Sequence, residues 1–355
     1  MKILFIITGL GMGGAEKVVS NLADLYQKNG HSITIISLKA PILVRPESED
    51  VNIINLNINN ALDFIKSIFT LRKIIKKTKP DVIHAHMFHA IIISRICRLI
   101  TKMPKLISSA HNTIDGSKLR FFVYRITDFL SDITTNVSQD AVNSFIKSHA
   151  VNKNKIICVD NGIDTLKFKK LNLDKSYSND KLTFLSIGSL TKQKDYPNLF
   201  YALSLFKKEY GSNFVQLIVG SGPLEQSLFQ LSTQLGLQDN IIFLGIRHDI
   251  PELLSQCDLF ILSSAWEGFG LVVAEAMACE ALVIGTDCGG VKDVISEYGF
   301  IVPSHNYELL KSAIIDAINL TPEQKNFIQK QARAYIVDKY SLTKMANKYL
   351  ELYKH

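Results

Sequence analysis

Two acidic residues stand on either side of a glycine-rich turn in the second half of the chain. The stretch "DLFILSSAWEGFGLVVAEAMACEALVIGTDCGG" places Glu267 before a Gly-Phe-Gly turn and Glu275 in the second turn of the helix predicted to begin near Leu271. Glycines let backbone amides approach a ligand, and the unpaired N–H groups of a first helical turn favour a phosphate. Carboxylates would repel phosphate alone but accept hydrogen bonds from hydroxyls. The pattern therefore indicates a phosphate that carries sugar hydroxyls, as in a nucleotide sugar.

A second glycine cluster follows the first predicted strand, in "MKILFIITGLGMGGAEKVV". Gly9, Gly11 and Gly14 have the G-x-G-x-x-G spacing of a dinucleotide site, in which an acidic residue about twenty positions later binds the ribose. Here the second strand ends in "SLKA", with Lys39 near the position where that carboxylate is expected. A nicotinamide dehydrogenase is therefore disfavoured, and the loop fits some other anion at the start of the helix from Gly14.

Short apolar runs that alternate with longer amphipathic segments must position these residues. This alternation predicts parallel sheets with crossover helices, whose ligands lie beyond the carboxyl ends of the strands. Strands are expected at residues 2–8, 32–38, 51–56, 81–86, 105–111, 132–137, 182–188, 215–220, 240–245, 259–264 and 282–286, and helices include 14–29 and 138–150.

The pattern restarts after the polar stretch from Asn172 to Lys181, the most linker-like segment of the chain. We therefore expect an α/β protein with two doubly wound domains, residues 1–170 and 171–341. A chain of 355 residues also exceeds the usual length of one domain. A spanning helix is not predicted, because no apolar run reaches about eighteen residues. The opening "ILFII" is too short and too directly followed by glycine for a signal peptide, so we expect a cytoplasmic location.

Cysteines and histidines give little sign of a metal centre. The five cysteines are scattered without a C-x-x-C pair, which is typical of buried free thiols. His84, His86 and His89 in "HAHMFHA" form a weak metal signature without a carboxylate partner, and structural roles are favoured for at least two of them. No metal and no cofactor are expected.

The glutamate pair and other motifs together resemble the retaining glycosyltransferases of family 4. The pair has the family's Glu, seven residues, Glu spacing, and further matches follow in family order: "GLGMGGAEKVV", "AHNT" at His111, "DNGID" at 160–164, "IGSLTKQKDYPNL", "LIVGSGP", "IIFLG" and "CGGVKDVI". The resemblance covers nearly the whole chain. It implies the GT-B fold, two Rossmann-like domains that face a central cleft, with a C-terminal helix at about 342–355 that packs back on the N-terminal domain.

The resemblance also implies roles for residues, position by position. Glu275 would hold the donor ribose, Glu267 would contact sugar hydroxyls near the anomeric carbon, and the amides of Phe269–Val272 would hold the diphosphate. His111 would lie near the transferred sugar and β-phosphate, although a histidine at the end of a strand can equally be structural. The implied catalytic set is His111, Glu267 and Lys194, and the implied donor-binding set is Gly14, Ser189, Lys194, Gly222, Arg247, Glu267, Gly268, Phe269, Gly270, Leu271, Val272 and Glu275.

One position departs from the family pattern. An arginine usually follows the glycine of the segment "IGSLTKQK", but this chain has Ser189, while Lys194 matches the companion lysine. A bidentate guanidinium is thus replaced by one point charge and a serine hydroxyl. Whether Lys192 or another cation compensates stays open.

The implied reaction is a retaining transfer. A hexose or N-acetylhexosamine would pass from a nucleotide diphosphate sugar, UDP-linked by family frequency, to a hydroxyl of a glycan or lipid-linked acceptor in cell-surface polysaccharide, lipopolysaccharide or glycolipid biosynthesis. Metal independence is expected because no two aspartates have D-x-D spacing. A GT-B-shaped sugar-nucleotide epimerase and a noncatalytic nucleotide-sugar binding protein remain the alternatives.

Positive charge is concentrated in the first half of the chain. Residues 1–160 contain 21 Lys and Arg against 12 Asp and Glu, a net of +9, within a total of +7. The stretch from Lys66 to Lys79, "KSIFTLRKIIKKTK", has the composition of a helix that could lie on anionic lipid at the inner face of the cytoplasmic membrane. A solvated surface helix fits it equally well. Nucleic-acid binding has little support, because the basic residues match no recognised module.

Overall fold

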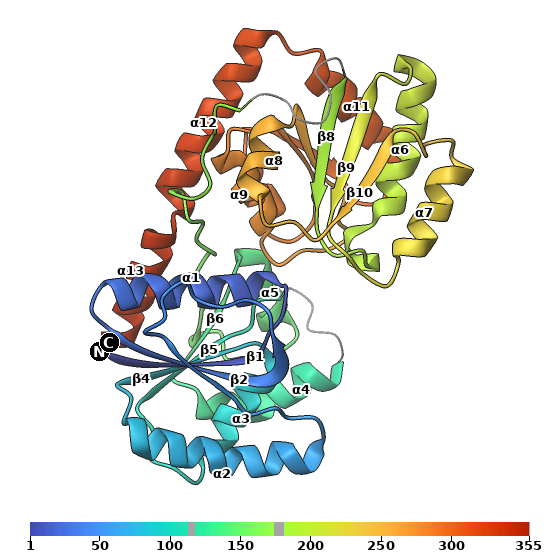
Figure 1. Cartoon of the computed structure of the whole chain (residues 1–355). Helices are drawn as coiled ribbons and strands as arrows, with labels where there is room; N and C mark the ends of the chain where they lie inside the picture. The colour runs from blue at the N-terminus through green and yellow to red at the C-terminus, as the bar shows by residue number, and fades with distance from the viewer. Residues whose placement is uncertain (113–117, 174–180, 355) are drawn as a thin grey trace. The chain divides into compact units, whose positions relative to one another are not determined.

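The computed structural model describes residues 1–112, 118–173 and 181–354, and it divides into two compact units (Figure 1). The first unit comprises Met1–Gly162 and Leu342–His355, and the second comprises Ile163–Ser341. Each unit contains one parallel sheet with helices on both faces, which confirms the expected doubly wound α/β architecture. The chain passes between units after Gly162, rather than after residue 170 as the sequence analysis placed it.

The first unit is built on a seven-stranded sheet with the strand order β3-β2-β1-β4-β5-β6-β7. Its elements are β1 (Lys2–Leu10), α1 (Gly14–Lys28), β2 (Ser32–Ile42), β3 (Asn52–Asn55), α2 (Ala61–Thr78), β4 (Val82–His86), α3 (Phe88–Arg98), β5 (Lys105–Ser109), α4 (Lys118–Thr127), the 3-10 turn η1 (Asp128–Leu130), β6 (Ile133–Asn136), α5 (Gln139–Lys147), β7 (Ile156–Cys158) and α13 (Leu342–Lys354).

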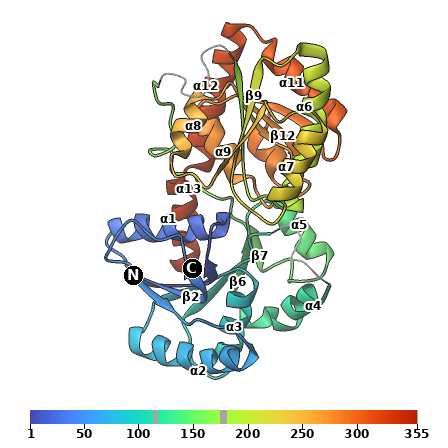
Figure 2. The same cartoon turned by 45° about the vertical axis from the view of Figure 1, so that its right-hand side comes forward.

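Helices cover both faces of this sheet, so its central strands are almost entirely buried. Residues 3–7 of β1 are all buried, as expected for a strand packed on both sides. In Figures 1 and 2, α2, α3 and α4 lie on one side of the sheet and α1 lies on the other. Helix α13 joins α1, where the Tyr26 hydroxyl donates to the Ala346 carbonyl at 2.8 Å. The last helix of the chain is therefore part of the first unit.

The second unit is built on a six-stranded sheet with the order β10-β9-β8-β11-β12-β13. Its elements are β8 (Leu182–Ile187), the 3-10 turn η2 (Lys192–Lys194), α6 (Tyr196–Tyr210), β9 (Phe214–Val219), α7 (Glu225–Gln234), β10 (Ile241–Gly245), α8 (Ile250–Gln256), β11 (Leu259–Leu262), α9 (Leu271–Ala278), β12 (Val283–Asp287), α10 (Val291–Ile295), β13 (Phe300–Pro303), α11 (Tyr307–Ile318) and α12 (Pro322–Tyr340).

The loops at the carboxyl ends of these parallel strands gather at one edge of each sheet. In the second unit, α6 and α7 lie on one face of the sheet and α8 and α9 on the other (Figure 2). The two residues just before the stretch expected as a linker are bonded to this unit, because Leu171 N donates to Ser255 Oγ at 3.0 Å and Lys170 Nζ to the Ser255 carbonyl at 2.7 Å. Residues 174–180 of that stretch lie outside the described residues.

Candidate functional site

A buried carboxylate and a lysine meet where β8 and β11 of the second unit end. Lys194 Nζ lies 2.5 Å from Glu267 Oε1, and the Ser264 hydroxyl donates to the same oxygen at 2.7 Å. Glu267 is only 8% exposed. These contacts fix the carboxylate in one orientation, and they bring together two of the residues assigned to the site from the sequence.

The loop that carries Lys194 is joined to the loop after β11 by hydrogen bonds. The Ser263 hydroxyl donates to the Lys194 carbonyl at 2.8 Å, and Ala265 N donates to the Gln193 carbonyl at 2.8 Å. The side chain of Lys194 then passes over Gly188, where an added Cβ would stand 2.7 Å from Lys194 Cε. Only a glycine at position 188 leaves room for the lysine in this conformation.

Helix α9 begins beside this pair with the glycine-rich turn. Gly270 precedes the helix at a φ of +91°, a left-handed conformation that glycine adopts without strain. The Phe269 ring packs edge-on against Tyr340 at a centroid distance of 5.2 Å, which anchors the turn in the core of the unit. The amides of Leu271 and Val272 precede the first intrahelical hydrogen bonds of α9. A helix start with such amides favours an anion.

Glu275 lies in the second turn of α9 and is 4% exposed. Its charge acts on the neighbouring thiol, since burial first and Glu275 second raise the pKa of Cys279 to about 12. Glu267 precedes the turn in the sequence and Glu275 follows it, and both side chains are buried.

Three residues of the implied donor-binding set have evident structural contacts. A Cβ at Gly222 would overlap the backbone of Leu190, so this glycine lets the loops after β8 and β9 pack closely. The Arg247 guanidinium forms a bidentate pair with Asp249, at 2.8 and 2.5 Å, and holds the pKa of that carboxyl below its ordinary value. The Ser189 hydroxyl lies 3.3 Å from the Thr191 hydroxyl.

In the first unit, the glycine cluster after β1 surrounds a carboxylate of the chain itself. Gly14 is the first residue of α1, and a Cβ added at Gly13 would overlap Oε2 of Glu16. Burial raises the pKa of Glu16. The external anion that the sequence analysis expected here stays a prediction, and that analysis did not single out Glu16. The sequence feature that could have pointed to Glu16 is its place as an acidic residue in the first turn of α1, two positions after Gly14.

His111 follows β5 and pairs with a second histidine. Its Nε2 lies 2.9 Å from Nδ1 of His86, the last residue of β4, because β4 and β5 are neighbours in register. His111 is 9% exposed and has a φ of +71°, which is uncommon outside glycine. The shared hydrogen bond links the two tautomers: if His86 donates from Nδ1, the neutral His111 ring carries its proton on Nδ1.

His84 lies behind this pair and is fully buried. Its ring nitrogens contact the Ser109 hydroxyl at 2.6 Å and the Tyr353 hydroxyl at 2.7 Å. Burial holds the pKa values of His84 and His86 well below the ordinary value and lowers that of His111 to about 4, so all three rings are neutral at pH 7. The described part of the chain contains no cluster of three potential metal ligands.

Two family models together match most of the chain. The model described as Glycosyltransferase Family 4 matches residues 12–167, and the one described as Glycosyl transferases group 1 matches residues 168–334. The chain belongs to the family 4 glycosyltransferases.

Named relatives and solved structures agree with this family. The Escherichia coli UDP-Gal:alpha-D-GlcNAc-diphosphoundecaprenol alpha-1,3-galactosyltransferase is 26% identical over 81% of this chain and 79% of its own. A Campylobacter jejuni diphospho-undecaprenol 4-alpha-N-acetylgalactosaminyltransferase is 23% identical over 98% of this chain and 99% of its own. The crystal structure of Anabaena HepE in complex with UDP has a TM-score of 0.83 at 22% identity and covers 99% of both chains. These matches confirm the GT-B fold.

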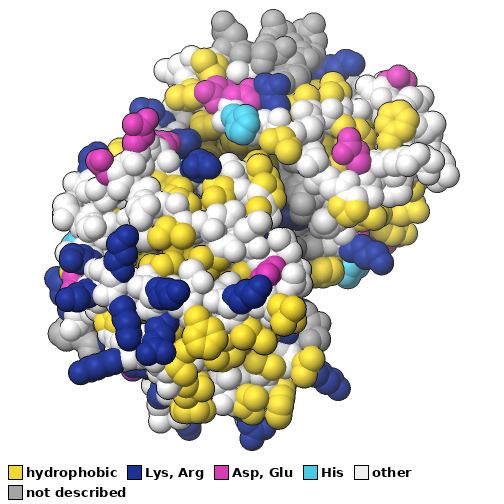
Figure 3. All heavy atoms as spheres, turned by 60° about the horizontal axis from the view of Figure 1, so that its bottom comes forward, with side chains coloured by type: hydrophobic (Ala, Val, Ile, Leu, Met, Phe, Trp, Pro, Cys, Tyr) yellow, Lys and Arg dark blue, Asp and Glu magenta, His cyan; other side chains and the backbone are white. Residues whose placement is uncertain are grey.

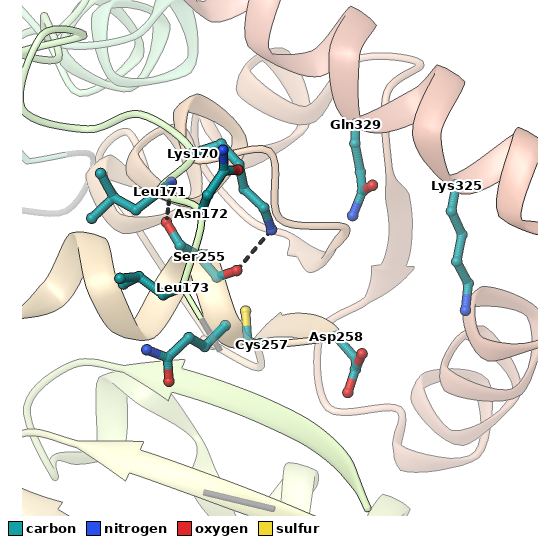
Figure 4. A pocket seen from close by; sticks show the side chains of 10 residues that line it. Lys170, Leu171, Asn172, Leu173, Ser255, Cys257, Asp258, Lys325 and Gln329 are labelled. Carbon is teal, nitrogen blue, oxygen red and sulfur yellow. Dashed lines mark hydrogen bonds between the residues drawn. The ribbon is translucent and has the colours of Figure 1, made fainter. Parts of the chain in front are cut away.

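The glycosyltransferase also has a cavity of about 320 Å³ in its second unit (Figure 4). Lys170, Ser255, Cys257 and Asp258 are among the residues that line it. Cys257 and Asp258 precede β11, whereas Ser264 and Glu267 follow that strand. The cavity therefore lies at the amino-terminal end of the strand and is distinct from the site described above.

Proposed function

We propose that this glycosyltransferase transfers a hexose or N-acetylhexosamine, with retention of configuration, from a UDP-linked donor to a hydroxyl of a glycan or lipid-linked acceptor. The observation that carries the proposal is the Lys194–Glu267 pair at the start of α9. The names of the two relatives, which both act on diphosphoundecaprenol-linked glycans, support such an acceptor in polysaccharide or glycolipid biosynthesis. The UDP named for the galactosyltransferase and bound to HepE supports the donor.

In this proposal the diphosphate is held by charge and by fixed dipoles. Lys194 and the amides of Leu271 and Val272 stabilise the negative charge that develops on the leaving group, without a divalent ion. Glu267, oriented by Lys194 and Ser264, accepts hydrogen bonds from sugar hydroxyls. Glu275 accepts those of the ribose.

The bond between the anomeric carbon and the diphosphate oxygen breaks, and a bond from the acceptor oxygen to that carbon forms on the same face. The acceptor proton passes to the departing phosphate oxygen, so the reaction needs no further base. Binding of the nucleotide positions the reacting atoms and lowers the barrier of this step.

A donor screen with site variants tests the proposal. Thermal shifts with a panel of nucleotide sugars select the donor, and radiolabelled transfer to undecaprenyl-diphosphate glycans measures turnover. We expect Lys194→Ala and Glu275→Ala to raise the donor KM or abolish transfer, while the exposed Lys208→Ala remains normal. Lys192→Ala shows whether that lysine compensates for Ser189. Near-normal kinetics in Lys194→Ala and Glu275→Ala would exclude the site.

Two further measurements address mechanism. NMR coupling constants of the new glycosidic bond report whether the anomeric configuration is kept. Transfer should persist in EDTA, and activity that is lost in EDTA and restored by Mn²⁺ would contradict metal independence. Release of an epimerised sugar nucleotide without acceptor would instead favour an epimerase.

A further inference from the structure

Helix α4 of the first unit exposes a continuous row of large apolar side chains. Leu119, Phe122, Ile126 and, in η1, Phe129 are 69%, 56%, 51% and 70% exposed. Steps of three, four and three residues place them on one side of the helix. Single exposed apolar residues are ordinary, but a contiguous row marks an interaction surface.

Helix α2 has an outer surface that begins apolar and ends basic. Leu62, Ile65 and Phe69 in its first half are each more than half exposed. The exposed lysines that continue this surface are Lys66, Lys73, Lys76 and Lys77. Burial of Leu71 and Ile75 fixes which side of the helix faces the core.

These two helices lie on the same side of the sheet. Both contact α3, and Figures 1 and 2 show α2, α3 and α4 opposite α1. Figure 3, which brings the bottom of Figure 1 forward, shows yellow apolar side chains beside a group of dark-blue Lys and Arg. We define the α2–α4 face as the exposed residues Leu62, Ile65, Lys66, Phe69, Lys73, Lys76, Lys77, Lys118, Leu119, Phe122, Arg125, Ile126 and Phe129.

Exposed negative charge is absent from both helices, 61–78 and 118–127. Asp63, the acid of α2, is partly buried and accepts a hydrogen bond from Asn59 N at 3.2 Å. Helix α4 contains no acidic residue. Asp128, which follows α4, is buried and pairs with Arg95 at 3.4 Å. The α2–α4 face therefore presents apolar and basic groups together.

We propose that the α2–α4 face binds to the surface of a bilayer that contains anionic lipids. Apolar side chains of amphipathic helices enter the boundary between headgroups and acyl chains, while lysines attract anionic headgroups. A second copy of the chain is the poorer occupant, because an isologous contact would bring two basic surfaces together. The inference extends the lysine-rich α2 of the sequence analysis to a second helix, and it goes beyond the proposed reaction without depending on it.

Vesicle co-sedimentation of the full chain tests this surface. The vesicles contain either phosphatidylcholine alone or phosphatidylcholine with about 30% phosphatidylglycerol, an anionic fraction high enough to attract polybasic segments. We expect binding to the anionic vesicles only. The Lys73→Glu/Lys76→Glu/Lys77→Glu variant and the Phe122→Ser/Phe129→Ser variant should each lower the partition coefficient more than about tenfold.

The matched control reverses three exposed lysines of the second unit, Lys169, Lys208 and Lys330, and should bind as the wild type does. Circular dichroism checks that each variant is folded, and Phe122→Ala with Lys-to-Ala changes replaces any variant that is not. Equal binding by the wild type and both face variants would overturn the proposal. A second outcome would also overturn it: sedimentation velocity shows a dimer in the wild type that is lost in the Phe122→Ser/Phe129→Ser variant, while that variant still binds vesicles. If the protein binds the vesicles but binds no nucleotide sugar, the proposed reaction is contradicted and the proposed lipid-binding surface is retained.

Discussion

At the scale of single residues, the candidate site depends on one ion pair that sequence spacing could not reveal. Lys194 and Glu267 are 73 positions apart and meet only because β8 and β11 are neighbours in the sheet. The family resemblance assigned both residues, whereas their mutual contact and the Ser264 hydrogen bond required the structure. Glu16 was missed because its carboxylate turns back into the glycine cluster.

Neutralising Glu267 should impair transfer more than donor binding. In Glu267→Gln, Lys194 loses its counter-charge and the sugar hydroxyls lose a charged acceptor, so we expect kcat to fall about 10²-fold or more. Steady-state kinetics with the selected donor measures this. Glu225→Gln, at an exposed position in α7, is the control. An unchanged kcat would show that this carboxylate takes no part in the transition state.

The three buried histidines should make stability depend on pH. The pKa of His111 is lowered to about 4 and those of His84 and His86 are also lowered, whereas unfolded histidines titrate near 6.5. The unfolded chain then binds more protons at mildly acid pH, so the free energy of unfolding rises with pH through this window. The stabilisation is complete above about pH 6.5 and is lost as the pH falls toward 4.

Each such histidine contributes a slope of up to about 1.4 kcal/mol per pH unit in this range. Urea unfolding of the wild type, His111→Asn and the exposed control His248→Asn between pH 7 and 5 measures the slope. We expect His111→Asn to flatten it and His248→Asn to leave it unchanged. Identical slopes in all three proteins would contradict the prediction.

At the scale of elements, the periodicity argument predicts the central strands and the short edge strand β3, but it misses the edge strands β7 and β13. β7 and β13 have three and four residues and lie at the ends of their sheets. Such short runs show no periodicity, and one partner strand suffices to form them. The pairing of His86 with His111 was accessible in principle, because carboxyl ends of adjacent parallel strands meet at one edge.

Substitution of Gly222 should disturb the packing of two loops. An added Cβ would overlap the Leu190 backbone, so Gly222→Ala must displace the loop after β8 or β9 and should cost about 1–3 kcal/mol of unfolding free energy. Gly9→Ala is a suitable comparison, because its Cβ would have 3.9 Å to the nearest atom. Chemical denaturation measures both. Equal stability of the two variants would show that the loops adjust freely.

At the scale of the whole molecule, the first unit is formed by two segments of the chain that are separated by the whole of the second unit. The first unit takes its closing helix from residues 342–354, after the second unit is complete. Basic residues are concentrated in the first unit, and no helix in the described ranges is long and apolar enough to cross a membrane. The α2–α4 face, for which we propose a lipid surface as partner, belongs to this basic unit.

Removal of residues 342–355 should destabilise the first unit selectively. The deletion takes away the Tyr353 partner of His84 and the Ala346 partner of Tyr26. We expect hydrogen exchange to accelerate in β1, β4 and β5 while β8 to β12 keep their protection. Exchange that accelerates equally in both sheets would mean that the two units unfold together.

The late position of α13 also bears on how the protein is made. A ribosome releases the second unit's complete sequence while the pocket for Tyr349 and Tyr353 is still unfilled. The earlier-synthesised sheet must then wait, with its tyrosine-binding surface open, for the final segment to emerge. Slow translation of residues 342–354 would prolong this vulnerable interval, during which chaperones and proteases compete for the chain.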